Sequence, residues 1–250
     1  MKCEGEKIYE KPGKCPVCHM SLEKVIETIP SHSTEVESDK VTCVGSMKNV
    51  MHKGELFGTI NLDTISDKQH LYGLGPIEYL KGEILIDNGI SYLSKVGVNG
   101  TMIIEETYKV KAPFFVYENV SSWKNEIISD NIQTIPELEV YLDQISKNHS
   151  RPFAFKLTGT VESANIHIVN LPKGTKVHSP EEAHQNQKNF ILKNEDVELI
   201  GFFSTKHQGV FTQHDSYVHI HLLSADKKKM GHLEEMLMKK GSVKLFLGEE

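Results

Sequence analysis

Short apolar segments separated by turn signals recur along the chain after residue 41, and they limit the folds open to it more than any other feature. Apolar runs of about four to eight residues bounded by Gly, Pro, Asn or Asp are typical of β-strands. The segments are Glu55 to Asn61, Glu83 to Ile86, Ser91 to Val96, Thr101 to Tyr108, Phe114 to Val116, Phe153 to Val161, Asn165 to Val169, Val197 to Ser204, Tyr217 to Leu223 and Ser242 to Leu247. We therefore expect strands to dominate.

Helical spacing of apolar residues occurs in two stretches. One is Thr134 to Lys147, and the other is Ala225 to Lys240, where Leu233, Met236 and Leu237 form a stripe. Apolar residues three to four positions apart lie on one face of a helix. The pattern as a whole predicts a mixed α/β, β-rich fold in which mixed sheets carry a few covering helices.

Composition narrows the function classes. The 250 residues, of which 38% are hydrophobic, suffice for one large domain or two subdomains. A net charge of -6, with no basic block longer than Lys227 to Lys229, argues against nucleic acid as a partner. No apolar run reaches the roughly 20 residues of a membrane span. The first residues lack the apolar core of a signal peptide, and the compartment stays open, since a signal already removed would leave the same sequence.

All four cysteines lie in the first part of the chain, and Cys15 and Cys18 are separated by two residues. This gap lets two thiolates bind one metal ion, and the preceding Pro12-Gly13 favours the tight turn that such a knuckle needs. The alternatives are a redox pair and a local disulfide. A redox pair usually opens a helix within a strand-helix-strand unit, which this region does not indicate.

The stretch from Tyr9 to Leu22 resembles the second half of a small heavy-metal-binding module found beside copper and zinc transport proteins. The shared positions are Pro12, Gly13, Cys15, Pro16, Cys18, Met20 and Leu22. The resemblance implies a thiophilic ion held by Cys15 and Cys18, with Cys3 as a third ligand, although the segment around Cys3 departs from the first half of the module. We assign residues 1–27 to this module and the polar residues 28–40 to a linker.

The strongest chemical pattern lies near the carboxyl end. Residues i and i+2 of a strand project from one face, so His219 and His221 can point at one ion. We expect a turn at Ser224 to Lys229, followed by a helix that returns His232 to the same ion. Three neutral imidazoles are a common catalytic zinc set that leaves one coordination position open. Among 13 histidines a chance His-x-His pair is common, and a cupin-type site would add a glutamate that Leu222 to Ala225 lacks.

The segment from Tyr217 to His232 resembles the zinc signature of the acetolactate decarboxylase family, in which Gly-His follows His-x-His after a fixed interval. Leu71 to Gly75 and Leu80 to Gly89 resemble two further blocks of that family, and the resemblance spans roughly residues 41–247. It implies a domain over residues 41–250 with an amino-terminal subdomain, 41–150, and a carboxyl-terminal metal-site subdomain, 151–250.

The family's reaction converts 2-acetolactate to acetoin and CO2. The resemblance therefore implies a carboxy-lyase acting on 2-acetolactate or a close 2-hydroxy-3-oxo acid, with Zn²⁺ or another divalent metal stabilising an enediolate. His219, His221 and His232 are the implied metal ligands, and Glu83 matches the active-site glutamate that handles the proton. A cytoplasmic homodimer is also implied.

Two departures favour a rival function, a non-catalytic metal- or ligand-binding relative. Lys156 stands where the family carries an arginine, and it loses the bidentate fork while keeping the charge. We expect Lys156 to contact the substrate carboxylate. The sole arginine, Arg151, lies at an odd offset that places it on the opposite strand face. The family also returns a second glutamate from a tail that the sequence does not show.

Overall fold

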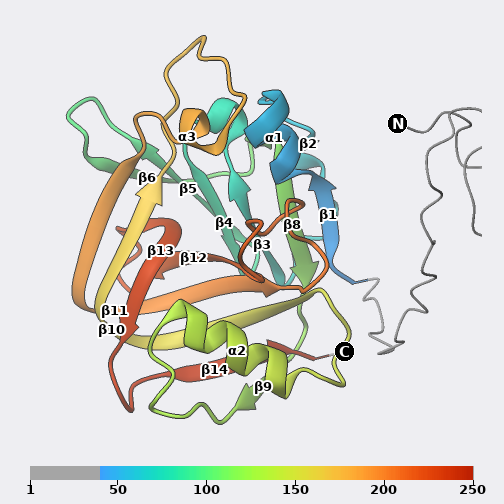
Figure 1. Ribbon diagram of the computed structural model, residues 1–250, viewed down its shortest axis with the longest axis vertical. Helices are drawn as coiled ribbons and strands as arrows, with labels where there is room; N and C mark the ends of the chain where they lie inside the picture. Colours follow the sequence, from blue (N-terminus) through green and yellow to red (C-terminus); the bar gives the residue numbers. More distant parts are fainter. Residues whose placement is uncertain (1–39, 250) are drawn as a thin grey trace, which may run out of the picture. The chain divides into compact units, whose positions relative to one another are not determined.

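Two six-stranded sheets make up most of the computed structural model, which describes residues 40–249 (Figure 1). The segment that contains Cys3, Cys15 and Cys18 lies outside the described residues, so the amino-terminal metal module stays a prediction. The described part confirms a strand-rich fold with few helices. None of its helices is both long and apolar enough to cross a membrane.

The first sheet has the strand order β1-β8-β3-β4-β5-β6, with every neighbouring pair antiparallel. Its strands are β1 (Thr42–Gly45), β3 (Leu71–Pro76), β4 (Glu83–Asp87), β5 (Ile90–Val96), β6 (Met102–Glu106) and β8 (Phe114–Asn119); β2 (Ile60–Asn61) and β7 (Lys111–Ala112) form a separate pair. Leu74 and Leu85 face the second sheet and pack with Ile200 and Phe202. Ile84 and Ile86, on the opposite face of β4, belong to another apolar cluster.

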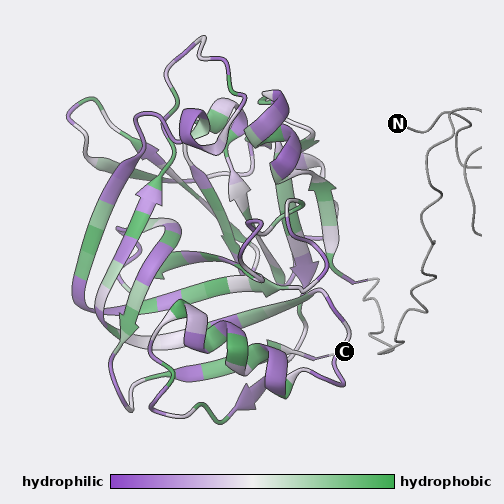
Figure 2. Cartoon of the chain, in the orientation of Figure 1, coloured by the Kyte–Doolittle hydropathy of each residue, from purple (hydrophilic) through white to green (hydrophobic). Residues whose placement is uncertain are grey.

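The second sheet has the order β11-β12-β13-β10-β14-β9, with an additional pairing between β10 and β11. Its strands are β9 (Trp123–Glu126), β10 (Phe153–Ile168), β11 (Lys188–Phe203), β12 (Val218–Ser224), β13 (Met230–Met238) and β14 (Lys244–Gly248). Because β10 pairs with both β11 and β13, the strands from β10 to β13 close on themselves. Figure 2 shows polar and apolar residues alternating along β10 and β11, as expected for strands whose faces meet different surroundings.

Helix α2 (Ile135–Ile145) covers the second sheet and confirms the helix expected at Thr134 to Lys147. It begins with a capping box, in which Thr134 and Glu137 satisfy each other's backbone N–H groups. Leu138 and Leu142 are fully buried against strand residues such as Phe155. The short helices α1 (Met47–Lys53) and α3 (Pro180–Ala183) contact each other at the opposite end of the second sheet from α2 (Figure 1).

Most of the expected strands are present, with differences in their bounds, and Val197 to Ser204 corresponds to the second half of the longer strand β11. The segments Phe153 to Val161 and Asn165 to Val169 belong to one strand, β10, whose partners continue through the intervening residues. The first expected strand, Glu55 to Asn61, is extended only at Ile60–Asn61. Strand β9 and helix α2 precede residue 150, yet β9 is a strand of the second sheet and α2 packs on that sheet, whereas β1 to β8 belong to the first sheet or to the separate β2-β7 pair.

The helix expected at Ala225 to Lys240 is wrong, because this region forms a turn and strand β13. The register between β10 and β13 shifts between Asn165, which pairs with Glu235, and Ile166, which pairs with Leu233. Such a β-bulge adds one residue to a strand. It turns the two-residue period of the strand into a three-residue gap between Leu233 and Met236, and this gap imitates the spacing of a helix.

Candidate metal centre

Strand register brings four histidines to one place in the second sheet. His219 and His221 lie two residues apart on β12, as predicted, and project from one face. On β13, His232 pairs directly with His221. On its other edge the same His232 pairs with His167 of β10. The strand closure therefore collects side chains that are far apart in the sequence.

The three histidines predicted as metal ligands are close enough to share an ion. One nitrogen from each of His219, His221 and His232 lies within 4.8 Å of the other two. Their ring centres are 4.9 Å to 5.5 Å apart. Nδ1 of His219 and both nitrogens of His221 are buried without a hydrogen bond to the described protein. Buried polar atoms normally have partners, so one orphaned nitrogen of His219 and one of His221 fit a bound metal.

Burial also fixes the protonation state of this triad. It lowers the pKa of His219 to about 3, far below the ordinary histidine value. Burial, reinforced by repulsion from neighbouring histidines, places the pKa values of His221 and His232 well below that value too. A metal binds the neutral imidazole, so the protein presents these ligands without having to remove protons near neutral pH.

Gly231 allows β13 to approach β10 next to His232. A Cβ added at this position would lie 2.6 Å from the backbone oxygen of His167. That distance is far shorter than carbon and oxygen atoms tolerate, so a side chain here would separate the two strands. The glycine of the Gly-His pair in the sequence motif thus has a packing reason, since it holds His232 against β10.

Glu83 lies at the start of β4 with its carboxylate directed at the histidines. Oε2 is 3.7 Å from Nε2 of His221, and Oε1 is 3.8 Å from Nε2 of His167. Oε1 also accepts a hydrogen bond from the backbone N–H of Val169 at 3.1 Å. Burial raises the pKa of Glu83 well above its usual value, and the Val169 hydrogen bond only partly opposes this rise. The carboxyl group can therefore hold a proton beside the triad.

The turn before Glu83 has a strained backbone. Tyr79 and Leu80 both have positive φ, at 60° and 51°, although neither is glycine. Left-handed conformations of such residues cost about 1–2 kcal/mol each and persist where the surrounding structure imposes them. Leu80 lines the cavity that contains Glu83. The strain is thus located in the segment that places the carboxylate.

His167 is a site residue that the sequence analysis missed. It is buried, its ring centre lies 4.7 Å from that of His232, and its Nδ1 is 2.5 Å from Oε1 of Glu234. Contact with His167 is the main cause that lowers the pKa of Glu234. Glu234 is the extra residue of the β13 bulge, so the bulge turns this carboxylate toward the site.

Two cavities reach the histidines. The larger, about 380 Å³, is lined by Glu83, His167, His219, His232 and apolar residues including Leu80, Phe114 and Val169. The smaller, about 290 Å³, is also lined by His219 and His232. The larger cavity has the size and the mixed apolar and polar lining of a small-molecule site.

The structure does not bring Lys156 to this place. Its Nζ lies 3.4 Å from Oε1 of Glu198 and 5.0 Å from the centre of the Trp123 ring, and Lys156 lines neither cavity. Arg151 is held by Asp143 at 2.8 Å and by the hydroxyl of Ser146 at 2.9 Å. Among residues 40–249, the basic side chain in ring contact with the triad is a fourth histidine, His167.

Comparisons with known proteins agree with this architecture. An acetolactate decarboxylase from Bacillus subtilis subspecies spizizenii has a TM-score of 0.69 at 18% identity, covering 84% of this chain and 86% of its own. The alpha-acetolactate decarboxylase of Bacillus subtilis strain 168 gives 0.67 at 19% identity, with the same coverage. A Staphylococcus aureus protein of unknown function, similar to alpha-acetolactate decarboxylase, gives 0.66 at 17% identity, covering 83% of this chain and 84% of its own. These likenesses show a shared fold.

A search of curated proteins gave no match. The family model for alpha-acetolactate decarboxylase matches residues 44–249, which include both sheets apart from the start of β1, and every candidate site residue of the described part. This chain therefore belongs to the alpha-acetolactate decarboxylase family, a family of carboxy-lyases.

Proposed function

We propose that this protein decarboxylates 2-acetolactate, or a close 2-hydroxy-3-oxo acid, to acetoin and CO2 with the help of a divalent metal, Zn²⁺ in the first place. The observation that carries the proposal is the set of neutral imidazole nitrogens without protein partners beside the buried carboxyl of Glu83. His219, His221 and His232 would hold the ion. When bound, it supplies Lewis acidity to the carbonyl next to the carbon that loses CO2.

The residues of the site divide the remaining work. Breaking the bond to the carboxylate releases CO2 and leaves the electron pair on the hydroxyl-bearing carbon, which must then take up a proton. Glu83 is suited to deliver that proton, because burial keeps its carboxyl protonated at higher pH than an exposed glutamate. The apolar wall formed by Leu80, Phe114 and Val169 excludes water from the reacting carbon.

His167 is the group best placed to receive the substrate carboxylate. It lines the larger cavity, and Glu234 fixes its ring through Nδ1, which leaves Nε2 on the side of Glu83. An imidazole oriented by a carboxylate is a common arrangement in catalytic sites. This assignment replaces the sequence-based role of Lys156, whose ammonium contacts Glu198 instead.

The direct test is acetoin formation from racemic acetolactate by the zinc-loaded protein. His219→Ala and His221→Ala should lose both the bound zinc and the turnover. His178→Ala is the matched control, because His178 is exposed and lines neither cavity. Zinc-loaded protein that produces no acetoin would contradict the proposal and favour a binding relative without catalytic activity.

Two expectations from the sequence are tested separately. If Cys15 and Cys18 hold a second, thiophilic ion, replacing both with serine should lower the metal content while acetoin production per main-domain zinc stays the same. Equal loss of turnover would instead connect that segment to catalysis. The homodimer stays a prediction, and light scattering on the purified chain would show whether it forms.

A further inference from the structure

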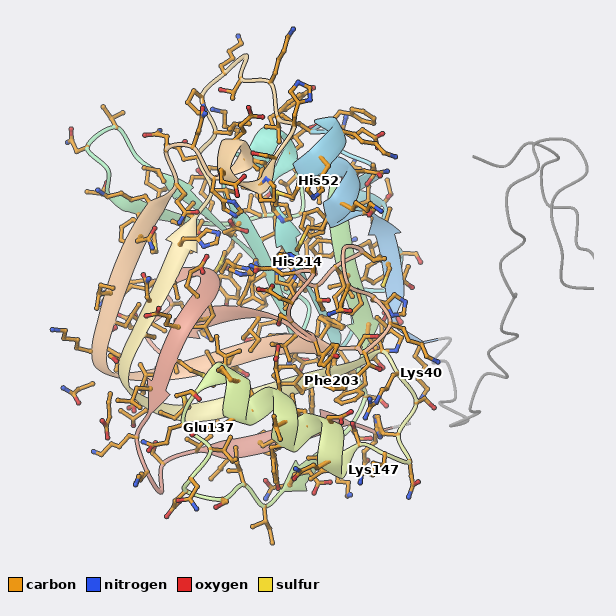
Figure 3. The ribbon with its side chains drawn as sticks, viewed as in Figure 1. Lys40, His52, Glu137, Lys147, Phe203 and His214 are labelled. Atoms are coloured by element: carbon orange, nitrogen blue, oxygen red, sulfur yellow. The ribbon has the colours of Figure 1, made fainter. Side chains whose placement is uncertain are left out.

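The two cavities that reach the histidines differ in charge. The rim of the larger one carries the basic or neutral side chains of Lys48, His52 and His214. Figure 3 labels two of these, His52 on α1 and His214 on the loop between β11 and β12. A basic rim suits an anionic substrate, because charged walls raise the local concentration of the opposite charge.

The smaller cavity is acidic. Glu139, Asp215 and Glu234 line it, and no lysine or arginine does. His219, which also lines this cavity, is only 4% exposed, and its Nδ1 has no hydrogen-bond partner among the described residues. The wall of the acidic cavity thus includes a histidine with a buried nitrogen that has no protein partner. A divalent cation fits both the charge of the wall and the free nitrogen.

A second group of donor atoms lies where the two cavities adjoin, since His232 lines both, Glu234 lines the smaller and His167 lines the larger. One donor atom each from His167, His232 and Glu234 lies within 4.8 Å of the other two. This group shares His232 with the triad, and Glu234 lines the smaller cavity. Because His232 pairs with His167 on one side and with His221 on the other, its ring belongs to both groups and connects them.

We propose that His167, His232 and Glu234 form an entry position where a divalent cation from the acidic cavity binds first. The ion then exchanges His167 and Glu234 for His219 and His221 while His232 stays bound. The inference rests on the metal triad of the proposed function. In the loaded protein Glu234 is released to orient His167, so one carboxylate serves metal loading and later substrate binding.

The rate of metal uptake tests this inference. Full-length metal-free protein carrying Cys3→Ser, Cys15→Ser and Cys18→Ser is mixed with Co²⁺ in a stopped-flow spectrometer, so that the visible absorbance reports histidine ligation alone. Glu234→Gln should slow uptake by about 10-fold or more, because it removes the charged donor of the entry position. Asp215→Asn should slow uptake by roughly 2- to 5-fold at low salt and have no effect at high salt, where exposed charges are screened.

Matched controls show whether slower uptake results from losing the entry position or only from the change in the protein's net charge. Glu162→Gln removes the same charge from the exposed face of β10, outside both cavities, and should leave the rate unchanged. Lys48→Gln, at the basic rim, should change it little. The final Co²⁺ spectrum and stoichiometry should be the same in all these proteins, and turnover of the loaded Asp215→Asn protein should equal that of the unmodified chain.

Several outcomes would overturn the entry position. Normal uptake by both Glu234→Gln and Asp215→Asn would show that His167 and Glu234 form only an orienting pair. A rate that responds to Lys48→Gln alone would place entry in the larger cavity. Loss of equilibrium affinity in Glu234→Gln would make Glu234 a permanent ligand. If the unmodified chain binds no Co²⁺, the triad fails as well, and the proposed function fails with it.

Discussion

Glu83 and Asp87 stand on the same face of β4, about 14 Å apart along the strand, yet they meet opposite surroundings. Around Glu83 lie His219 and His221, whose buried nitrogens lack protein partners, and we call this part of the interface between the sheets the histidine end. Around Asp87, at what we call the charge-paired end, acidic side chains have a lysine as partner: Nζ of Lys227 lies 3.5 Å from Asp87 and 3.6 Å from Glu198. Apolar residues such as Leu85 separate the two ends.

The two ends differ in whether their buried polar groups have protein partners, and this difference is what separates a candidate ligand site from a structural charge pair. Burying a polar group without a partner costs free energy, so unpartnered groups persist where something other than the protein completes them. Paired charges need no further ligand. Lys156 belongs to the charge-paired end, because Glu198 lies beside its ammonium and three aromatic rings surround it. Its identity in the sequence suggested chemistry, whereas its partners indicate structure.

The largest expected effect is on turnover, when the acid at each end of β4 is replaced by its amide and the two variants are compared. Glu83→Gln should lower acetoin production by about 10²- to 10⁴-fold at full zinc occupancy, because the amide cannot deliver a proton. Asp87→Asn, on the same face of the strand, should stay within about 3-fold of the unmodified protein. Equal losses in the two variants would mean that the distinction between the ends has no catalytic meaning.

The second-largest expected effect is a loss of stability on acidification, which arises at the histidine end. The folded-state pKa values of the triad lie below the ordinary value of 6.5, with that of His219 at about 3. Below pH 6.5 the unfolded chain therefore binds more protons than the folded one, and the stability of the metal-free protein falls as pH falls toward 3. Between pH 7 and 5.5 the loss should be about 2–4 kcal/mol. Asp87, whose pKa is raised mainly by burial, has the opposite sign.

Urea unfolding of the chelator-treated protein at pH 7.0, 6.2 and 5.5 measures this effect. In His221→Gln the slope of stability against pH should be smaller, because one depressed imidazole is gone, whereas Asp87→Asn should not reduce it. An acid response that is unchanged in His221→Gln would show that the triad is not its source.

The sequence was sufficient for what depends on local spacing. The two-residue period of a strand placed His219 and His221 on one face, and the apolar stripe from Ile135 to Ile145 located α2. The closed arrangement of strands β10 to β13 could not be predicted from the sequence, because it depends on pairings between distant segments. His167 was missed for this reason, although its position between Ile166 and Ile168 already placed it on the opposite face from two buried apolar residues.

The distance of Lys156 from the histidines was hidden from the sequence for a related reason. A motif gives a residue's position along a strand, but the neighbouring strand decides what its side chain meets. Opposite Lys156 the register supplies Ile200 on one side and Phe246 on the other, with Glu198 two residues from Ile200. A bulge had a similar effect at Glu234, where one added residue changed the apparent period of β13.

Replacing Lys156 should therefore affect folding more than catalysis. Lys156→Met leaves the partly buried Glu198 with one cation fewer, and we expect a loss of about 1–3 kcal/mol in the free energy of unfolding. The specificity constant of the zinc-loaded protein should stay within about 3-fold. Lys244→Met, at an exposed position on the neighbouring strand β14, is the control for removing a charge. A 10-fold lower specificity constant with unchanged stability would restore the role expected from the sequence.

The smallest expected effect is a gain in stability, whereas the other substitutions lower stability or activity. In the metal-free protein the ring of His221 is fully buried, and no hydrogen bond of good geometry reaches either of its nitrogens, although one approaches the backbone of Ile84. His221→Leu removes an unsatisfied polar group, so the unfolding free energy should rise by about 1 kcal/mol even as zinc binding is lost. The same change at His167 should lower it, because Glu234 would lose its contact. If His221→Leu destabilises the chelated protein as much as His167→Leu does, then His221 has a protein partner, and the orphaned nitrogens that distinguish the histidine end do not point to a metal.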